Sequence, residues 1–354
     1  MKIIGNIAAL LVITVLGYLL FHPELFLFSP AIPVQSGQEP LGEQEQHSSS
    51  ELTVPSQAQD NGEQKPFDSQ KKRSGPEPMA RPRYQYSIDS ANRTPQSLAV
   101  DREHLIVSYR NLNLIDFLDY EGNRLGMFDP APREKLKIAS LYADAQGTLY
   151  ISDVENRMIL VFDGAKHFLN FFPSGQGEQG KRPLFPVGMA GNDRIIVVAD
   201  MGAATVKTYL PQGEFVMALD KPTSGEQGPW HPVGVAITKD GRTLVSDLSG
   251  KRVSVFSCAG EFVYFFSEPE TGEGPLKPGA MAIDSLGRVH LVDSGSHRIF
   301  VYDNFGRFLF TYGGVDSPDR GMNAPTGIAI DTENNLVYIA DSGNRQIDVW
   351  SLPK

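Results

Sequence analysis

The sequence predicts an all-β chain folded as a six-bladed β-propeller, preceded by one transmembrane helix and a disordered linker. Three observations in the 354 residues lead to this prediction. Residues 3–21 are apolar and uncharged, and the stretch that follows them is rich in Gln, Glu, Ser, Gly and Pro. Beyond that stretch, a pattern of four short strand-like runs repeats six times.

Residues 3–21 are expected to cross a membrane. Nineteen residues at about 1.5 Å each span roughly 28 Å, which is close to the hydrocarbon thickness of a bilayer. Lys2 precedes the segment and Glu24 is the first charge after it, so residues 1–2 should be cytoplasmic and the propeller extracytoplasmic. A cleaved signal peptide is the alternative, and it also exports the rest of the chain. The compact anchor and the single cysteine, Cys258, favour a bacterial periplasm or cell surface.

Residues 22–82 are expected to form a disordered linker. From about Gln35 to Arg83, large apolar residues nearly vanish. Such a segment cannot bury enough apolar surface to offset the entropy lost on ordering. A flexible chain of this length reaches about 40 Å. The propeller should therefore occupy residues 83–354, as a single-pass membrane protein with its folded domain outside.

Each repeat begins with a strand-like run of small residues. These runs end at Ala99, Tyr142, Ala190, Ala236, Ala282 and Ala329, which are 43, 48, 46, 46 and 47 residues apart. A second run ends in an aspartate in five repeats, at Asp153, Asp200, Asp247, Asp293 and Asp341. Two further strand-like runs follow, separated by a turn that often contains glycine. Four short strands with turns between them are typical of a propeller blade.

The last repeat stops after its third strand, at Ser351–Lys354. An unassigned strand-like run, Arg83–Asp89, precedes the first repeat. We expect this N-terminal strand to complete the last blade by pairing with the third strand around Ile347 to Trp350. Closure of this kind removes an exposed sheet edge.

The repeats resemble the NHL-repeat family of six-bladed propellers. The resemblance covers about residues 84–354 and is carried by runs such as Asp341-Ser-Gly-Asn-Arg-Gln-Ile-Asp-Val-Trp350 and Asp153-Val-Glu-Asn-Arg-Met-Ile-Leu-Val-Phe162. The first repeat departs most, with Tyr109 in place of the aspartate. The resemblance implies the fold, but NHL propellers include protein-binding platforms, RNA-binding modules, extracellular sensors and a few enzymes.

A metal-dependent lyase or hydrolase with its site in the central channel is the alternative to a binding role. The resemblance to NHL-like lyases implies zinc-binding histidines just after the proline of each inner strand. This chain has Val187, Val233, Gly279 and Thr326 there, and none of them binds zinc. Related lactonase-type propellers bind calcium at the axis. The candidate calcium ligands in this chain are Asp101, Asp144, Asp284 and Asp331, but aspartate is also a typical residue of hairpin turns. We therefore expect no cofactor and no catalytic residue.

Charge argues against a nucleic-acid partner. Residues 84–354 hold 25 Lys and Arg and 33 Asp and Glu, so the propeller carries 25 − 33 = −8. A phosphate-binding surface needs a basic footprint.

Recognition of a protein, peptide or glycan by the connections between repeats remains as the expected function. These are the longest connections, and on a propeller they share one face. They carry a set of basic and aromatic residues: Lys135, Lys137, Lys181, Arg182, Trp230, His231 and Lys277. An exposed tryptophan beside cations suits an interface; Trp230 packed onto its own blade is the alternative. The aspartates that end the second strands are expected to accept backbone N–H bonds in tight loops.

Overall fold

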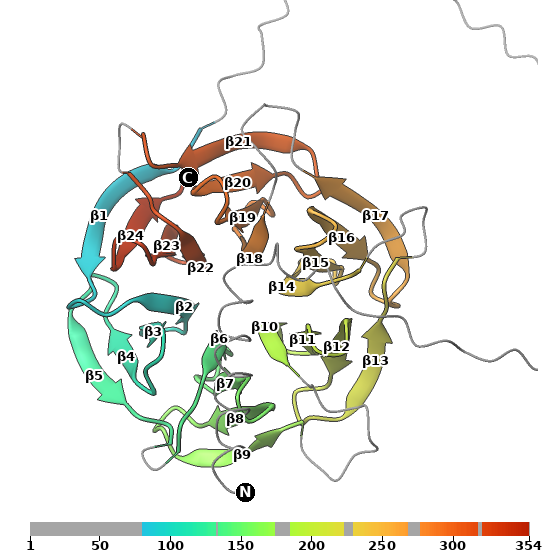
Figure 1. Cartoon of the computed structure of the whole chain (residues 1–354), viewed down its shortest axis with the longest axis horizontal. Helices are drawn as coiled ribbons and strands as arrows, with labels where there is room; N and C mark the ends of the chain where they lie inside the picture. Colours follow the sequence, from blue (N-terminus) through green and yellow to red (C-terminus); the bar gives the residue numbers. More distant parts are fainter. Residues whose placement is uncertain are drawn as a thin grey trace, which may run out of the picture. The chain divides into compact units, whose positions relative to one another are not determined.

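The computed structural model describes residues 80–131, 134–173, 185–222, 229–267, 277–317 and 321–353. They form six four-stranded antiparallel sheets around a central axis (Figure 1), which confirms the predicted all-β six-bladed propeller. Every regular element in these residues is a strand, so none of them forms a helix that could cross a membrane. The expected anchor and residues 22–79 of the expected linker lie outside the described residues.

Five blades are built from consecutive strands, ordered from the axis outward. Blade 1 comprises β2 (Pro95–Val100), β3 (Leu105–Tyr109), β4 (Ile115–Leu118) and β5 (Arg124–Phe128). Blade 2 comprises β6 (Ile138–Ala143), β7 (Leu149–Asp153), β8 (Met158–Phe162) and β9 (Phe168–Phe172). Blade 3 comprises β10 (Pro186–Gly191), β11 (Ile196–Asp200), β12 (Thr205–Tyr209) and β13 (Phe215–Leu219). Blade 4 comprises β14 (Pro232–Ile237), β15 (Thr243–Asp247), β16 (Arg252–Phe256) and β17 (Phe262–Ser267). Blade 5 comprises β18 (Pro278–Ile283), β19 (Val289–Asp293), β20 (Arg298–Tyr302) and β21 (Phe308–Gly313).

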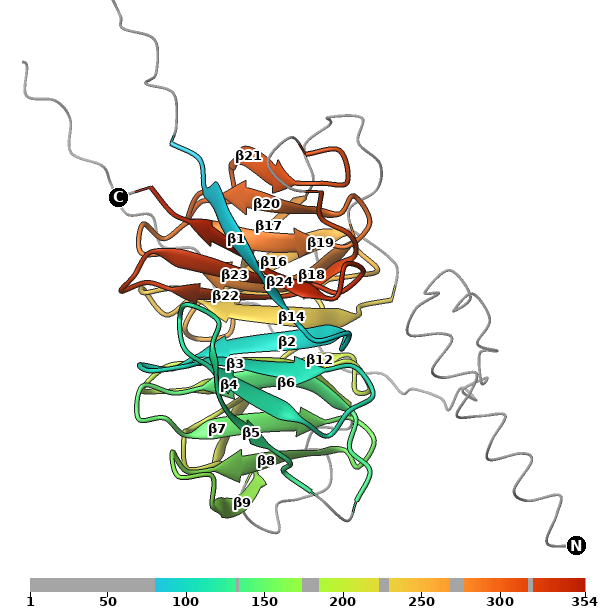
Figure 2. The ribbon, with the colours of Figure 1, turned by 90° about the vertical axis from the view of Figure 1, so that its left-hand side faces the viewer.

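Blade 6 combines strands from both ends of the propeller. Its inner three strands are β22 (Pro325–Asp331), β23 (Leu336–Asp341) and β24 (Gln346–Ser351). Its outer strand is β1 (Arg83–Asp89), which runs antiparallel to β24 with Arg83 opposite Ser351 and Asp89 opposite Gln346. Figure 2 shows β1 lying across the outside of this blade.

The inner strands approach one another so closely that small residues are required. A Cβ atom on Gly188 would lie 2.4 Å from the carbonyl oxygen of Val233 in the next blade. Serine hydroxyls link neighbouring inner strands directly, as where Ser140 Oγ accepts the backbone N–H of Met189 at 3.2 Å. The small residues that begin each repeat are therefore a consequence of convergence on the axis.

The hydrophobic core lies between neighbouring blades. In blade 2, Ile159 and Val161 pack with residues of blade 3, whereas Leu160 and Phe162 pack with residues of blade 1. Successive side chains of a strand point to opposite faces of its sheet. Both faces are apolar, because one neighbouring blade covers each of them.

Strand direction gives the propeller two faces. One carries the turns between the second and third strands of each blade and the connections to the next blade, and we call it the loop-rich face. Its six turns comprise residues 110–114, 154–157, 201–204, 248–251, 294–297 and 342–345. The opposite face carries the turns between first and second strands and those between third and fourth strands.

Candidate partner-binding face

A backbone clamp fixes the last residue of each long connection on the loop-rich face. In five blades the aspartate that ends the second strand accepts a backbone N–H from the end of the preceding connection. The donor is the residue just before the inner strand in blades 2–5 and the residue two positions before it in blade 6. The pairs are Asp153 with Lys137 at 3.0 Å, Asp200 with Phe185 at 2.8 Å, Asp247 with His231 at 3.0 Å, Asp293 with Lys277 at 2.8 Å and Asp341 with Asn323 at 2.8 Å. The aspartates are buried, with exposed fractions of 0 or 1 %. Three sequence-predicted site residues, Lys137, His231 and Lys277, therefore occupy one equivalent position.

The residue two positions after each aspartate supports the clamped side chain. In blade 4, Ser249 Oγ hydrogen-bonds His231 Nδ1. In blade 5, Gly295 leaves room for the lysine stem, since a Cβ atom there would lie 3.0 Å from Lys277 Cδ. In blade 2 the equivalent residue is Glu155, whose charge raises the pKa of Lys137 although burial, the larger effect, lowers it. The turn sequence thus orients the side chain that the clamp holds.

A second set of basic residues lies at the last position of the turns between second and third strands. Arg157, Lys251 and Arg345 are exposed there, with φ values of 57°, 49° and 56°. This left-handed conformation is uncommon for residues other than glycine, asparagine and aspartate. Among the described residues, their charged groups make no hydrogen bond or ion pair. They are available to a ligand.

His297 occupies the same turn position in blade 5 but has a structural contact. Its Nδ1 accepts the backbone N–H of Ala324 at 2.7 Å, so this nitrogen carries no proton. In blade 3 the position is Ala204, with φ 47°. The basic set therefore comes from blades 2, 4 and 6.

The turns of the two faces carry opposite net charge. The six turns of the loop-rich face contain four basic residues, Arg110, Arg157, Lys251 and Arg345, and one acid, Glu155, which gives 4 − 1 = +3. The turns of the opposite face contain 7 basic and 13 acidic residues, which gives 7 − 13 = −6. A propeller with a net charge of −8 thus concentrates positive charge in one set of turns.

The structure separates the other predicted site residues. Lys135 is exposed and lies in the same connection as Lys137. Lys181 and Arg182 lie outside the described residues. Trp230 is only 2 % exposed, and its ring centroid lies 6.3 Å from that of Phe256, so the indole packs onto its own blade. Of the two alternatives for Trp230, the structure shows the buried one, because the clamp at His231 draws the preceding residue inward.

Sequence reasoning missed Arg157, Lys251 and Arg345. They belong to the repeated runs that carry the family resemblance and were interpreted only as part of that pattern. Their common position, two residues before a β-branched residue of the third strand, could not reveal their left-handed backbone. Alignment of the six turns would have shown three basic residues at one position.

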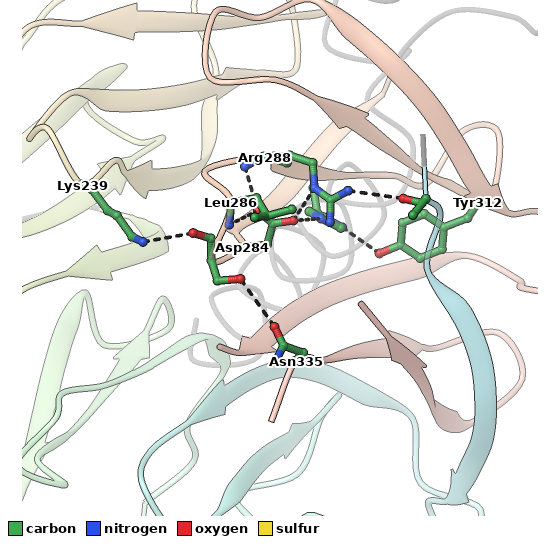
Figure 3. A network of polar contacts seen from close by, with 9 residues as sticks. Lys239, Asp284, Leu286, Arg288, Tyr312 and Asn335 are labelled. Atoms are coloured by element: carbon green, nitrogen blue, oxygen red, sulfur yellow. Dashed lines mark hydrogen bonds and ion pairs between the residues drawn. The ribbon is translucent and has the colours of Figure 1, made fainter. Parts of the chain in front are cut away.

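A polar network on the opposite face has the groups of an acid–base relay but no open access (Figure 3). Asp284 Oδ2 lies 3.3 Å from His290 Nε2, and His290 Nδ1 lies 3.0 Å from the hydroxyl of Tyr312. Arg288 Nε donates to the same carboxylate oxygen at 2.6 Å. Exposed fractions range from 0 % for His290 to 8 % for Arg288. The network therefore serves packing in blade 5.

Burial and hydrogen bonding set the charges in this network. Burial opposes ionisation of Asp284, but bonds from His290 and Arg288 outweigh it and lower the pKa of the carboxyl. Burial lowers the pKa of His290, although Asp284 opposes the change. The network thus holds a carboxylate, a guanidinium and a neutral imidazole.

The expected calcium residues are used by their own hairpins. Asp144 Oδ1, for example, accepts the backbone N–H groups of Gln146 and Thr148 at 2.9 and 2.8 Å. Asp331 and Asp101 make equivalent bonds within their turns. In the part of the chain that the structure describes, no three His, Cys, Asp or Glu side chains converge as metal ligands.

Comparison with known proteins agrees with the fold. No protein-family model matches the sequence. The NHL repeat-containing protein 2 of Gallus gallus is 38 % identical over 85 residues, which cover 21 % of this chain and 11 % of that protein. The chain thus matches about a ninth of the length of this relative.

Solved structures with a similar fold include two of virginiamycin B lyase from Staphylococcus aureus. One, substituted with selenomethionine, has a TM-score of 0.54 and 13 % identity, and covers 76 % of this chain and 99 % of that chain. The other, a catalytically inactive variant with quinupristin, has a TM-score of 0.56 and 12 % identity, with the same coverage. At these identities the likeness shows the fold alone.

The chain is a six-bladed β-propeller, five of whose blades present one clamped residue on a common face. Part of its sequence is similar to an NHL repeat-containing protein.

Proposed function

We propose that this chain is a membrane-tethered, extracytoplasmic propeller that binds a macromolecular partner at its loop-rich face. The observation that carries the proposal is the clamp. Five equivalent backbone hydrogen bonds hold Lys137, His231, Lys277 and their counterparts at fixed places around one face. Side chains on a rigid frame lose little entropy on binding, which favours affinity.

The exposed basic residues support the same proposal. Arg157, Lys251 and Arg345 stand outside the clamped residues on three different blades. A partner that contacts all three must span much of the face. A surface of that breadth suits a protein, peptide or glycan better than a small molecule, which binds in a concave pocket.

The sequence supports the tethering part of the proposal. Residues 3–21 have the length and composition of a membrane anchor, and residues 22–82 have the composition of a flexible linker. Within the propeller, the chain enters through Arg83, opposite Ser351, at the face away from the long connections. Entry at that edge leaves the loop-rich face unobstructed by the first strand.

We also propose that β1 closes the ring. Tyr84 packs edge-on against Trp350, with ring centroids 5.6 Å apart, and Ser87 Oγ donates to Asp348 Oδ1 at 2.6 Å. These contacts join the start of the propeller to its last repeat. They support a latch that protects the edge of β24.

Crosslinking in membranes of the source cell tests the binding role. Full-length protein carrying a photocrosslinking residue at position 203, an exposed position in a turn of the loop-rich face, should capture a distinct partner. The same residue placed at position 194, an exposed site on the opposite face, is the matched control and should not capture it. Equal capture from both positions would contradict a role for the loop-rich face.

A metal-dependent lyase or hydrolase remains the second candidate, because similar solved structures are named as lyases. Stoichiometric zinc or calcium retained by the purified full-length protein after dialysis would favour it.

A further inference from the structure

We infer that the loop-rich face takes a carboxylate-rich polypeptide segment. This inference rests on the proposed function and names the chemistry of its partner. Its starting point is the charge contrast, +3 in the turns of the loop-rich face against −6 in those of the opposite face. An anionic segment is attracted to the basic turns of the first face and repelled by the acidic turns of the second, so these turns favour the first face.

The cations are arranged for a ligand that reaches across blades. Lys137 and Arg157 belong to blade 2, Lys251 to blade 4, Lys277 to blade 5 and Arg345 to blade 6. Together they lie on four of the six blades. No single small anion contacts them all, whereas an extended chain with several carboxylates does.

The available basic groups lack partners of their own. In the described part of the chain, the charged groups of Arg157, Lys251, Lys277 and Arg345 make no hydrogen bond or ion pair. On the opposite face, three of the seven basic turn residues, Arg242, Arg288 and Arg307, pair with an aspartate of their own turn at 2.8, 2.6 and 2.6 Å. The exposed basic residues Arg157, Lys251 and Arg345 of the loop-rich face have no such pairing, so their charges are left for a ligand.

Among the described residues, the loop-rich face has one half-buried aromatic ring at a clamped position, Phe185, and no exposed one, which favours a polypeptide over a nucleic acid or a glycan. Single-stranded nucleic acids bind by stacking bases on exposed aromatic rings as well as by charge. Among the described residues, the exposed aromatic side chains lie on outer strands or on the opposite face; they are Tyr86, Phe168, Phe171, Phe265 and Phe305. Trp230, the tryptophan of the long connections, is buried.

The test uses full-length protein in nanodiscs of neutral lipid and fluorescent poly-L-glutamate of 20 residues as the probe. Binding is measured by fluorescence anisotropy at 50 and 300 mM NaCl. The variant R157N/K251N/R345N removes three charges, and asparagine tolerates the left-handed backbone of these positions. It should weaken probe binding by about tenfold or more at low salt, since three ion pairs at exposed sites contribute a few tenths to one kcal/mol each.

A second variant, R102Q/K166N/R194Q, is the matched control. It changes net charge equally but on the opposite face, and its affinity should stay within about twofold of the wild type. Equal losses in both variants would overturn the inference, because only net charge would then matter. Tighter binding of an oligothymidylate or polygalacturonate of equal length would also overturn it, in favour of a nucleic acid or a glycan.

Crosslinking with R157N/K251N/R345N separates this inference from the proposed function. Loss of the native partner supports both. Retention of that partner leaves the binding face in place and overturns the acidic chemistry. Capture of no partner by the wild-type protein counts against the proposed function itself, whatever the probe binds.

Discussion

Asp293 Oδ1 lies 2.8 Å from the backbone nitrogen of Lys277, sixteen positions earlier in the chain. The same carboxylate accepts the backbone N–H of Gly295 at 3.1 Å and the hydroxyl of Ser296 at 2.7 Å. One buried side chain therefore fixes both the end of a long connection and the turn beside it.

Replacing this aspartate should destabilise the propeller and loosen its face. In Asp293→Ala three donors on exposed or half-buried residues lose their buried acceptor, and each lost hydrogen bond to a carboxylate costs about 1–3 kcal/mol. We expect a fall in Tm of several degrees, measured by calorimetry, together with weaker partner capture. Asp293→Asn keeps one oxygen acceptor, so its Tm should fall less than that of Asp293→Ala. Equal effects of both variants would show that charge matters more than the hydrogen bonds.

The buried histidine of blade 5 should make the propeller sensitive to mild acid. Burial lowers the pKa of His290 in the folded state, so the unfolded chain binds a proton that the folded one does not. Its stabilising effect is present above the ordinary value near 6.5 and is lost as pH falls below that value. The pKa of Asp284 is also lowered, but its contribution declines only below about pH 3.8.

Comparing the pH dependence of Tm in the wild type and in His290→Gln separates the contribution of His290 from those of the other histidines. The glutamine amide can still donate to Asp284 but does not titrate. Between pH 7.5 and 5.0 the Tm of the wild type should drop more than that of the variant. Parallel curves for the two proteins would mean that other groups cause the acid sensitivity.

Two buried carboxyl groups in the last blade are linked by hydrogen bonds. Asp341 and Asp348 are fully buried, and Gln346 Nε2 donates to both, at 3.3 and 2.8 Å. Burial raises the pKa of Asp341. A raised pKa stabilises the fold at low pH, and this contribution is lost as pH rises through the folded-state value.

Asp348→Asn should therefore stabilise the propeller. The variant replaces a buried carboxyl group with a neutral amide, which can donate to Asp341 and keeps an oxygen that accepts from Ser87. We expect Tm to rise by about 2–4 °C at pH 8, which corresponds to roughly 1 kcal/mol for a domain of this size. The gain should shrink toward pH 4, as melting curves at several pH values would show. A lower Tm across the whole range would argue that the charge is needed.

Removal of β1 should weaken the ring. A chain beginning at residue 92 loses the buried Ile88 and the contact of Tyr84 with Trp350. It also exposes the edge of β24, which invites association. We expect Tm to fall by about 10 °C or more and oligomers to appear on size-exclusion chromatography. A chain beginning at residue 80 is the control, and unchanged behaviour of the shorter chain would contradict the latch.

Trp230 should matter for stability and not for direct contact with a partner. Trp230→Ala removes a ring that is 98 % buried, and loss of a core aromatic costs about 3–5 kcal/mol. Trp230→Phe should recover much of this loss, as denaturation curves would show. Normal Tm with impaired partner capture in Trp230→Ala would instead place the indole in the interface.

The repeats made the fold predictable, because spacing and strand pattern agree in all six. Small residues at Ala236 or Ala282 mark strands that converge on the axis, and turn glycines mark the hairpins. The candidate site could be predicted from the sequence only in part. Lys137, His231 and Lys277 could be chosen from their loops, but their equivalence depends on a hydrogen bond to a carboxylate sixteen residues away.

Burial at the edge of a loop was the hardest feature to anticipate. Trp230 stands between a proline and His231 in a polar connection, a setting that suits exposure. Its position follows from the clamp at His231 and the room beside Phe256, which are properties of the assembled blade.

The clamp also makes the length of each long connection independent of the position of the inner strand that follows it. Each long connection is held at its last residue, so additions or deletions upstream of that residue leave the inner strand and the clamped side chain in place. One blade can exchange its presented residue, as Phe185, His231 and Asn323 illustrate, without disturbing its neighbours. The residues presented on such a frame can therefore change one blade at a time, while the fold stays the same.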